Sequence, residues 1–235
     1  MVRKVCKVNS KCSNKFMTTE ELNVLWQYAS RWDRKFQLIL GFAAFRGLRI
    51  GEILAININD FTPDFSKVYV ILEKTNIGDW LPLPEGFSMF VKDYCMMNRH
   101  RFKDGYIFPF YSKSREKMPH LDTKTAEALI SKIRKIIGAE YPKFLEIVWQ
   151  TQERHRYRIG FHTLRRWHET HIWDIKHDHL LIADLMRYKD KTTPFTYISP
   201  YEHWKNEKDV MNHCFSPVYN KFQMGSVGQT KLSQF

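Results

Sequence analysis

The chain has 235 residues, with 37 Lys and Arg against 25 Asp and Glu, so its formal net charge is +12. Hydrophobic residues make up 43% and aromatic residues 15%, a globular composition that excludes a largely disordered protein. The positive charge favours a polyanionic partner, with nucleic acid as the first candidate and an anionic membrane as the second. Four scattered cysteines without a CxxC pair argue against a disulfide framework or a structural zinc site and favour a reducing compartment.

The N-terminal part is predicted to be a basic arm followed by a helix. Residues 1–16 hold five Lys and Arg and little apolar content, and they lack the apolar core of a signal peptide. Residues 17–30 have a helical apolar pattern, with Thr18 or Thr19 as the cap and glutamates in the first turn.

A second helix is predicted over residues 34–45, which are apolar on nearly every side. Such a helix is expected at the centre of the fold. Its apolar stretch, LILGFAAF, is too short to span a bilayer, which needs about 20 residues. Gly47 breaks the pattern, and RIGEILAI resumes a helix.

A small antiparallel hairpin follows. KVYVILE (67–73) alternates and is β-branched, TNIGD (75–79) is rich in turn residues, and WLPLP (80–84) can return as a strand.

The second half is predicted to be mostly helical, with a polar and basic connection at residues 150–160 and a flexible tail at 216–235. A last helix can start at Thr193 with Pro194 in its first position. The fold class is therefore mainly α with a small antiparallel β-hairpin (α+β), in one domain over residues 17–215. The other helices are predicted over residues 87–102, 123–141, 163–173 and 178–186.

Two separate stretches carry cationic groups in unusual places. In FRGLRIGEIL, Arg49 follows the glycine break in an apolar neighbourhood, where a guanidinium needs either a partner or an anion. Glu52, three residues on, can orient Arg49 or simply pair with it. In FHTLRRWHETH, His162 and Arg165 lie one helical turn apart near a helix start, where an anion is favoured.

Together with two further segments, these stretches resemble the tyrosine recombinases, the group of phage integrases and Xer-type resolvases. GLRIGEI resembles the family's first arginine box, GLRxSE, and HTLRRWHETH resembles HxLRHTFATH. EKTNIGDWLPLP resembles the family's hairpin, with Lys74 eight residues before Pro82, and LMRYKDKTTPFTY resembles LLGHSSIxTTxxY. Arg165 and Tyr197 are 32 residues apart and Arg49 and Lys74 are 25 apart, both typical of the family.

The resemblance implies a tyrosine recombinase catalytic-domain fold and a site-specific recombinase that cuts and rejoins duplex DNA without metal, ATP or another cofactor. Tyr197 would attack the scissile phosphate and form a 3′-phosphotyrosine. His162 would serve as the base, and Lys74 would protonate the departing 5′ oxygen. Arg49 and Arg165 would bind the non-bridging phosphate oxygens.

The sequence departs from the family pattern at several positions. Tyr188 stands where the family has its second histidine or tryptophan, and Arg187 stands where it has a glycine. The Tyr188 hydroxyl is a candidate catalytic hydrogen-bond donor, with Arg187 or Lys189 as alternatives. Arg166 replaces a histidine. Only about 16 residues precede the catalytic region, so the chain is expected to be either a fragment or a minimal form that grips DNA through its basic arm.

The remaining histidines of this segment are not assigned to the phosphate. His171 is expected to pack or hydrogen-bond within the fold, and His168, His177 and His179 are expected on the surface. HETH spaces its histidines three apart, whereas the zinc motif HExxH needs four.

Several alternatives remain open. Tyr201 and Tyr188 compete with Tyr197 as nucleophile. A type IB topoisomerase-like or telomere-resolving enzyme would share the same clamp, and a DNA-binding accessory protein without catalysis is a third possibility. The family resemblance also implies a tetramer on DNA, a helix at residues 201–215 that docks on a neighbouring protomer, and action in the cytoplasm of a prokaryote or a virus-infected host, with the chromosomal DNA.

Overall fold

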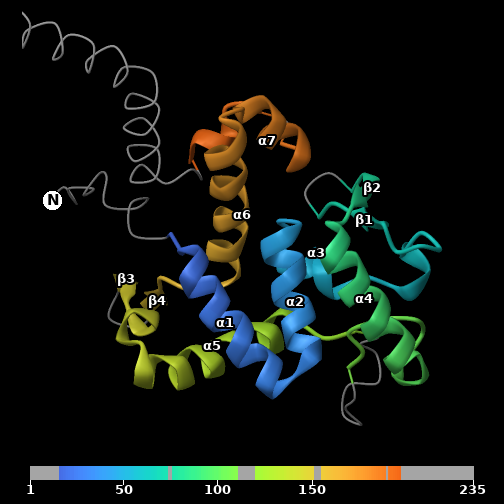
Figure 1. Ribbon diagram of the computed structural model, residues 1–235, viewed down its shortest axis with the longest axis horizontal. Coiled ribbons are helices and arrows are strands. Elements are labelled where there is room, and N and C mark those ends of the chain that lie inside the picture. The colour runs from blue at the N-terminus through green and yellow to red at the C-terminus, as the bar shows by residue number, and fades with distance from the viewer. Residues whose placement is uncertain (1–15, 74–75, 111–119, 151–154, 189, 197–235) are drawn as a thin grey trace, which may run out of the picture.

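In the computed structural model, the described residues are 16–73, 76–110, 120–150, 155–188 and 190–196 (Figure 1). They form a mainly helical fold with two separate two-stranded antiparallel sheets, as the sequence predicts for the class. The helices are α1 (Thr19–Trp32), α2 (Arg34–Phe45), α3 (Ile50–Leu54), α4 (Glu85–Asn98), α5 (Thr123–Glu140), α6 (Phe161–Lys176) and α7 (His179–Leu185), and the strands are β1 (Lys67–Ile71), β2 (Gly78–Pro82), β3 (Ile147–Gln150) and β4 (His155–Tyr157).

The first helix begins where the sequence predicts. Thr18, one of the two candidate residues, is the N-cap of α1, and its hydroxyl accepts a hydrogen bond from the Glu21 N–H at 3.2 Å. The Glu21 carboxylate accepts from the Thr18 N–H at 3.0 Å, which completes a capping box. Asp33 ends α1 and caps α2, since its carboxylate accepts from the Lys35 N–H at 2.8 Å.

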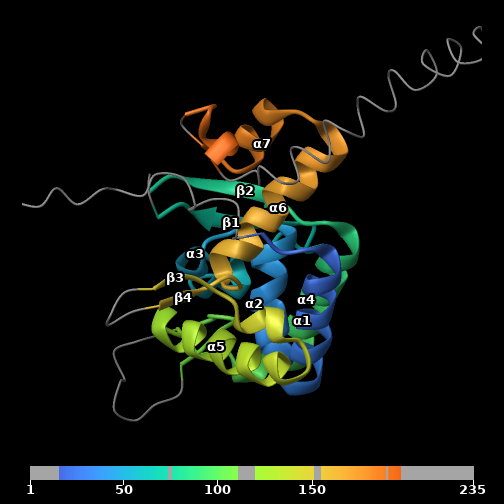
Figure 2. The ribbon, with the colours of Figure 1, turned by 90° about the vertical axis from the view of Figure 1, so that its left-hand side faces the viewer.

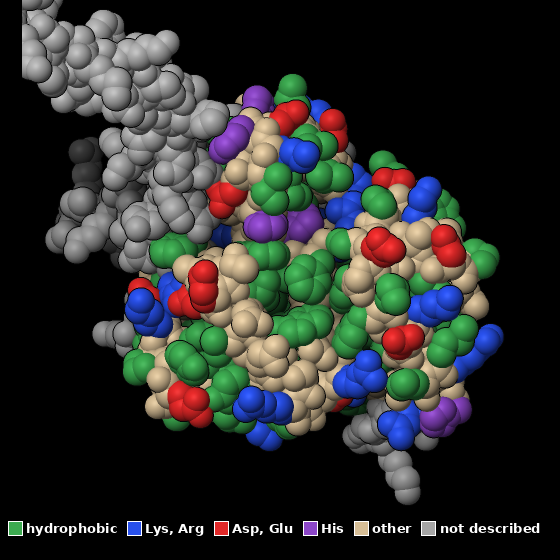
Figure 3. Space-filling model, in the orientation of Figure 1, with side chains coloured by type: hydrophobic (Ala, Val, Ile, Leu, Met, Phe, Trp, Pro, Cys, Tyr) green, Lys and Arg blue, Asp and Glu red, His purple; other side chains and the backbone are tan. Residues whose placement is uncertain are grey.

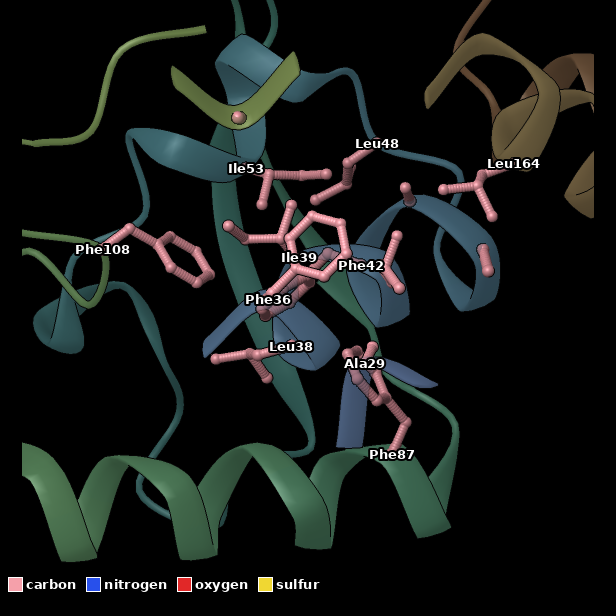
Figure 4. Packing of buried hydrophobic residues seen from close by; sticks show 14 of the residues in the cluster. Ala29, Phe36, Leu38, Ile39, Phe42, Leu48, Ile53, Phe87, Phe108 and Leu164 are labelled. Atoms are coloured by element: carbon pink, nitrogen blue, oxygen red, sulfur yellow. The ribbon is translucent and has the colours of Figure 1, made fainter. Parts of the chain in front are cut away.

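Helix α2 is the centre of the fold, as its apolar pattern predicts. Every residue from Phe36 to Ala44 is buried, and the helix packs against α1, α3, α4 and α6. Figure 4 shows Phe42 of α2 among buried side chains from α3 and the segment before it, from α4 and from α6. The Phe42 and Phe87 rings, for example, meet edge to face with their centroids 5.1 Å apart.

Gly47 sits in the break between α2 and α3, and the fold closes tightly around it. Its φ of +67° lies in the left-handed region, which glycine adopts without a steric penalty. A Cβ at this position would lie 2.7 Å from Cδ2 of His168 and 2.9 Å from Sδ of Met186. The absence of a side chain therefore lets α6 and the end of α7 approach the end of α2.

The predicted hairpin is present as β1 and β2. Its register pairs Lys67 with Pro82 and Ile71 with Gly78, so β2 begins two residues earlier than the sequence predicts. The predicted alternation of exposed and buried side chains is present in β1, where Val68 and Val70 are buried.

The second hairpin, β3–β4, was not predicted, and β4 falls within the segment assigned to a polar connection. Tertiary contacts rather than an apolar alternation hold this part of the chain. Arg158, just after β4, is 4% exposed and donates to both carboxylate oxygens of Glu21 at 2.5 and 2.9 Å. Its Nε lies 2.9 Å from the Glu146 carboxylate, and the Thr163 hydroxyl donates to its carbonyl. The start of α6 is thereby attached to the start of α1.

Helix α6 extends beyond its predicted bounds at both ends, and Thr193–Thr196 form a 3₁₀ turn where a helix start was predicted. Figures 1 and 2 show α6 running from the level of α1 and α5 toward the end of the molecule that holds α7 and the β1–β2 hairpin. Within the described ranges, no helix is long and apolar enough to cross a membrane.

We predict that Gly47→Ala lowers the free energy of unfolding by roughly 2–4 kcal/mol, because the new Cβ adds left-handed strain and overlaps His168 and Met186. Urea denaturation followed by circular dichroism measures this change. Gly86→Ala is the matched control: Gly86 is exposed near the start of α4, and its new Cβ would meet nothing within 4 Å. The control should be neutral or stabilised by up to about 1 kcal/mol. Equal effects of the two changes would contradict the close approach at Gly47.

Candidate active site

Arg165, in α6, joins three segments of the chain. Its side chain is 6% exposed, and Nη1 donates to the Gly47 carbonyl in the break between α2 and α3. Nη2 donates to the Tyr188 hydroxyl at 3.3 Å, and Nε lies 3.6 Å from a carboxylate oxygen of Glu169. A guanidinium has five N–H donors, so these three contacts leave two for an anion.

Arg49 is held by Glu52, as the sequence suggests. Arg49 is the N-cap of α3, and its Nη1 donates to Glu52 Oε1 at 2.8 Å. The other oxygen of Glu52 accepts from the Arg49 N–H, also at 2.8 Å. The Glu52 side chain is fully buried and that of Arg49 is 20% exposed, so a buried carboxylate anchors a partly exposed arginine.

His162 lies in the first turn of α6 with an exposed side chain. Partial desolvation lowers its pKa from the ordinary value, and the positive charges of Arg165, Arg166, Arg156 and Arg49 lower it further. The imidazole is therefore neutral at neutral pH, the state in which it can accept a proton. Arg49 and Arg165 are thus near enough to His162 for their charges to act on its pKa.

Tyr188 packs into the same network directly after α7. Its hydroxyl donates to Glu169 Oε1 at 2.7 Å and accepts from Arg165, whose guanidinium carbon lies 5.5 Å from the centre of the Tyr188 ring. Burial raises the pKa of Tyr188 above its ordinary value, so the hydroxyl keeps its proton. This proton is directed to Glu169.

Sequence reasoning missed Glu169. The residue is completely buried, and burial raises its pKa to about 7, although Tyr188 and nearby arginines favour its charged form. The sequence does contain a signal for this contact, because Glu169 lies four residues after Arg165 and thus on the same face of α6. The similar family box, HxLRHTFATH, has an alanine at this position.

The other histidines of this helix divide between core and surface. The prediction that His168 lies on the surface is wrong: it is 9% exposed, and Nδ1 lies 2.9 Å from the Ala44 carbonyl of α2. Burial among positive charges lowers the pKa of His168 to about 3, so it packs as a neutral ring. His171 packs as expected, stacked on Trp167 with ring centroids 4.8 Å apart, while its side chain stays exposed. His177 is exposed, as predicted, and His179 is half-buried.

Lys74, Tyr197, Lys189 and Tyr201 lie outside the described residues. The structure therefore brings together Arg49, His162, Arg165 and Tyr188, and the positions of the predicted general acid and nucleophile stay predictions. The described strands β1 and β2 flank Lys74 in the sequence.

The chain matches the model of the phage integrase family over residues 15–203. Among solved structures, XerA recombinase is similar with a TM-score of 0.65 and 19% identity, covering 85% of this chain and 65% of that one. The XerH site-specific recombinase bound to its difH substrate, in a pre-cleavage complex, has a TM-score of 0.57, 16% identity, and coverage of 78% and 49%. A lambda integrase dimer bound to a COC′ core site has a TM-score of 0.56, 17% identity, and coverage of 78% and 47%.

These similarities confirm the predicted fold. The chain spans about half to two thirds of the length of the structures it resembles. No curated protein sequence matches it significantly.

We predict that Glu169→Gln flattens the pH dependence of stability. The pKa of Glu169 is about 7 in the folded protein against an ordinary 4.5. The stability that this difference contributes is therefore fully present below pH 4.5 and is lost as pH rises through 7. The wild type should lose on the order of 2–3 kcal/mol of unfolding free energy from this group over that interval, and Glu169→Gln should not.

Chemical denaturation at pH 5 and pH 8 measures the difference. Glu127→Gln, which changes an exposed carboxyl of α5, is the control and should keep the wild-type pH dependence. A Glu169→Gln variant with the wild-type slope would contradict a Glu169 pKa of about 7 in the folded protein.

Proposed function

The chain belongs to the phage integrase family, and we propose that it is a site-specific DNA recombinase that cuts and rejoins duplex DNA through a 3′-phosphotyrosine. The observation that carries this proposal is that Arg165 of α6 donates to the Gly47 carbonyl, two residues before Arg49, while His162 lies one helical turn before Arg165 in the same helix. The net charge of +12 supports a DNA partner. In the view of Figure 3, Lys and Arg side chains gather between the part that holds α7 and the β1–β2 hairpin.

In the proposed reaction, the Tyr197 oxygen forms a bond to phosphorus while the bond from phosphorus to the 5′ oxygen breaks. His162 takes the tyrosine proton, and Lys74 gives a proton to the departing 5′ oxygen. Lysine suits this second role because, unlike arginine, it can release a proton. The phosphodiester energy stays in the phosphotyrosine bond, so the reverse attack by a 5′ hydroxyl rejoins the strand.

The two arginines stabilise charge on the non-bridging oxygens as the transition state forms. Arg49 is anchored by Glu52, and its partly exposed side chain has further donors for a DNA phosphate. Arg165 keeps two donors, and Tyr188 supports its guanidinium from the side. Tyr188 thus contributes by accepting a hydrogen bond from Arg165 and holding its guanidinium in place.

The substrate and assembly belong to the proposal as well. We propose that the substrates are duplex attachment or recombination sites and that the protein forms a tetramer on this DNA. The reaction would take place in a cytoplasm that contains the target chromosome. Residues 201–215 are proposed to dock on a neighbouring protomer. Deleting residues 201–235 should then abolish strand exchange, and exchange at the wild-type level would exclude this docking.

The deciding experiment is covalent capture. The full chain is incubated, with a chelator present, with a pool of nicked duplexes of random sequence, and DNA that stays bound under denaturing conditions is isolated and sequenced. We expect an adduct with the wild type and with Tyr201→Phe, and none with Tyr197→Phe. An adduct that persists in Tyr197→Phe would move the nucleophile to another tyrosine.

The captured sequences also separate the alternatives. Strand exchange between two copies of the captured site supports a recombinase, while resealing confined to one duplex supports a topoisomerase-like or telomere-resolving enzyme. A protein that binds the duplexes but forms no adduct would be a DNA-binding accessory factor.

We predict that Arg49→Ala lowers the rate of adduct formation by roughly 10³–10⁵, because a phosphoryl-binding arginine supplies stabilisation of that size. Single-turnover cleavage of a captured sequence measures the rate. Arg49→Lys should restore part of it, since the charge remains but the two-bond geometry is lost. Arg101→Ala, an exposed arginine in the 3₁₀ turn Arg99–Arg101, is the control and should cleave like the wild type. Wild-type cleavage by Arg49→Ala would exclude Arg49 from the phosphate site.

A further inference from the structure

Arg187 occupies a backbone position that normally selects glycine. It follows the end of α7, where the Tyr188 N–H donates to the Ala183 carbonyl at 2.8 Å and the Arg187 N–H donates to the Asp184 carbonyl at 3.1 Å. This bond pattern is a Schellman motif, and its left-handed residue is usually glycine. Arg187 has a φ of +53°, and the similar family string, LLGH, has a glycine there. The chain thus holds an arginine in a strained conformation beside the candidate active site.

The Arg187 side chain has unused hydrogen-bonding capacity. Its Nε and Nη1 are buried and have no hydrogen-bond partner among the described residues, although the residue as a whole is only half-buried. Buried donors without partners are costly, so such groups are expected to meet a ligand or water. Burial lowers the pKa of Arg187, and the positive charges of Arg165 and Arg49 act in the same direction.

Two carboxylates face Arg187 but do not occupy its donors. Asp79 and Glu52 both act to raise its pKa. Glu52 already bonds Arg49, and Asp79 is exposed on β2. Within the described part of the chain, neither carboxylate comes within ion-pair distance of the Arg187 guanidinium.

Arg46 fixes the backbone from which Arg187 extends. Both terminal nitrogens of Arg46 donate to the Leu185 carbonyl at 3.2 Å, two residues before Arg187. Arg46 is itself 6% exposed, and burial together with the charges of Arg187 and Arg165 lowers its pKa to about 10. Arg187 therefore lies within electrostatic range of Arg46, Arg49 and Arg165, an arrangement that a bound anion would relieve.

We propose that Arg187 binds a backbone phosphate of the DNA as a third guanidinium beside Arg49 and Arg165. The inference rests on the proposed function for the identity of the anion. It accounts together for the residue choice at a glycine position, the unpartnered donors and the excess of positive charge. A guanidinium suits this place because it remains charged when partly buried and presents donors in a plane that matches phosphate oxygens.

The test uses Arg187→Gly in the full chain, because this change separates a structural role from a binding role. Glycine relieves the left-handed strain, so the melting temperature should rise by roughly 2–4 °C. Loss of one phosphate contact should weaken binding to a mixed-sequence duplex of about 30 base pairs roughly tenfold at low salt. The slope of log K against log salt concentration should become shallower by about 0.9.

His177→Gly is the matched control. His177 ends α6 with a φ of +51° and an exposed side chain, so glycine relieves similar strain there. This variant should gain thermal stability while keeping the wild-type affinity and salt slope. Arg187→Lys should keep the wild-type salt slope, because it retains the charge.

A stabilised Arg187→Gly variant with wild-type affinity and slope would overturn the proposal. Asp79→Asn tests the rival role, in which Arg187 bridges to the hairpin through Asp79. If Asp79→Asn reproduces the binding defect of Arg187→Gly, the bridge explains it and the proposal fails; equal or tighter binding supports the phosphate contact.

All binding measurements are made in the Tyr197→Phe background, which removes the proposed nucleophile. A wild-type protein that forms no adduct, combined with a shallower slope for Arg187→Gly, would reject the proposed cleavage and keep the phosphate contact. The reverse pattern, adduct formation by the wild type with an unchanged slope for Arg187→Gly, would reject only the role of Arg187.

Discussion

The contact between α6 and the break after α2 is the constraint on which the site depends. Two side chains of α6, about one turn apart, reach backbone carbonyls in and next to this break: Arg165 donates to Gly47, and His168 lies in hydrogen-bonding range of Ala44 in the last turn of α2. Because Gly47 has no Cβ, α6 and Met186 can approach this closely. Arg49 follows two residues later as the cap of α3, so the same break that receives Arg165 also sets the position of the second arginine. One local conformation therefore fixes both proposed phosphate-binding groups.

The site also contains like charges and buried charges that are electrostatically unfavourable for the folded state. The charges of Arg165 and Arg187 act against that of Arg46, the charges of Arg165 and Arg49 act against that of Arg187, and burial disfavours the charge on both Arg46 and Arg187. The buried carboxylates offset this only in part, since Glu52 is committed to Arg49 and Glu169 titrates near neutrality. A cluster organised for stability alone would contain fewer positive charges or more acids. Such local conflict is expected where a protein is arranged to receive an anionic ligand.

The sequence predicted what local interactions determine. The cap at Thr18 or Thr19, the buried helix over residues 34–45 and the Arg49–Glu52 pair each depend on residues within a few positions of one another. The β3–β4 hairpin was missed because its neighbourhood is held by Arg158, whose partners Glu21 and Glu146 are distant in the sequence. His168 was misplaced for a similar reason, since its burial depends on how closely α6 meets α2. Glu169 had a local signal, its spacing from Arg165, but its link to Tyr188 arises only when the turn after α7 folds back onto α6.

The Glu169–Tyr188 pair has a consequence for how the site would respond to DNA. The tyrosine hydroxyl has one proton, and in this structure it goes to Glu169, so it cannot also go to a phosphate oxygen. A phosphate bound at Arg165 would bring negative charge toward a carboxyl whose pKa is already about 7, and like charges raise such a pKa further. The direction of the Tyr188 hydroxyl proton and the protonation of Glu169 are therefore coupled to the charge that Arg165 receives.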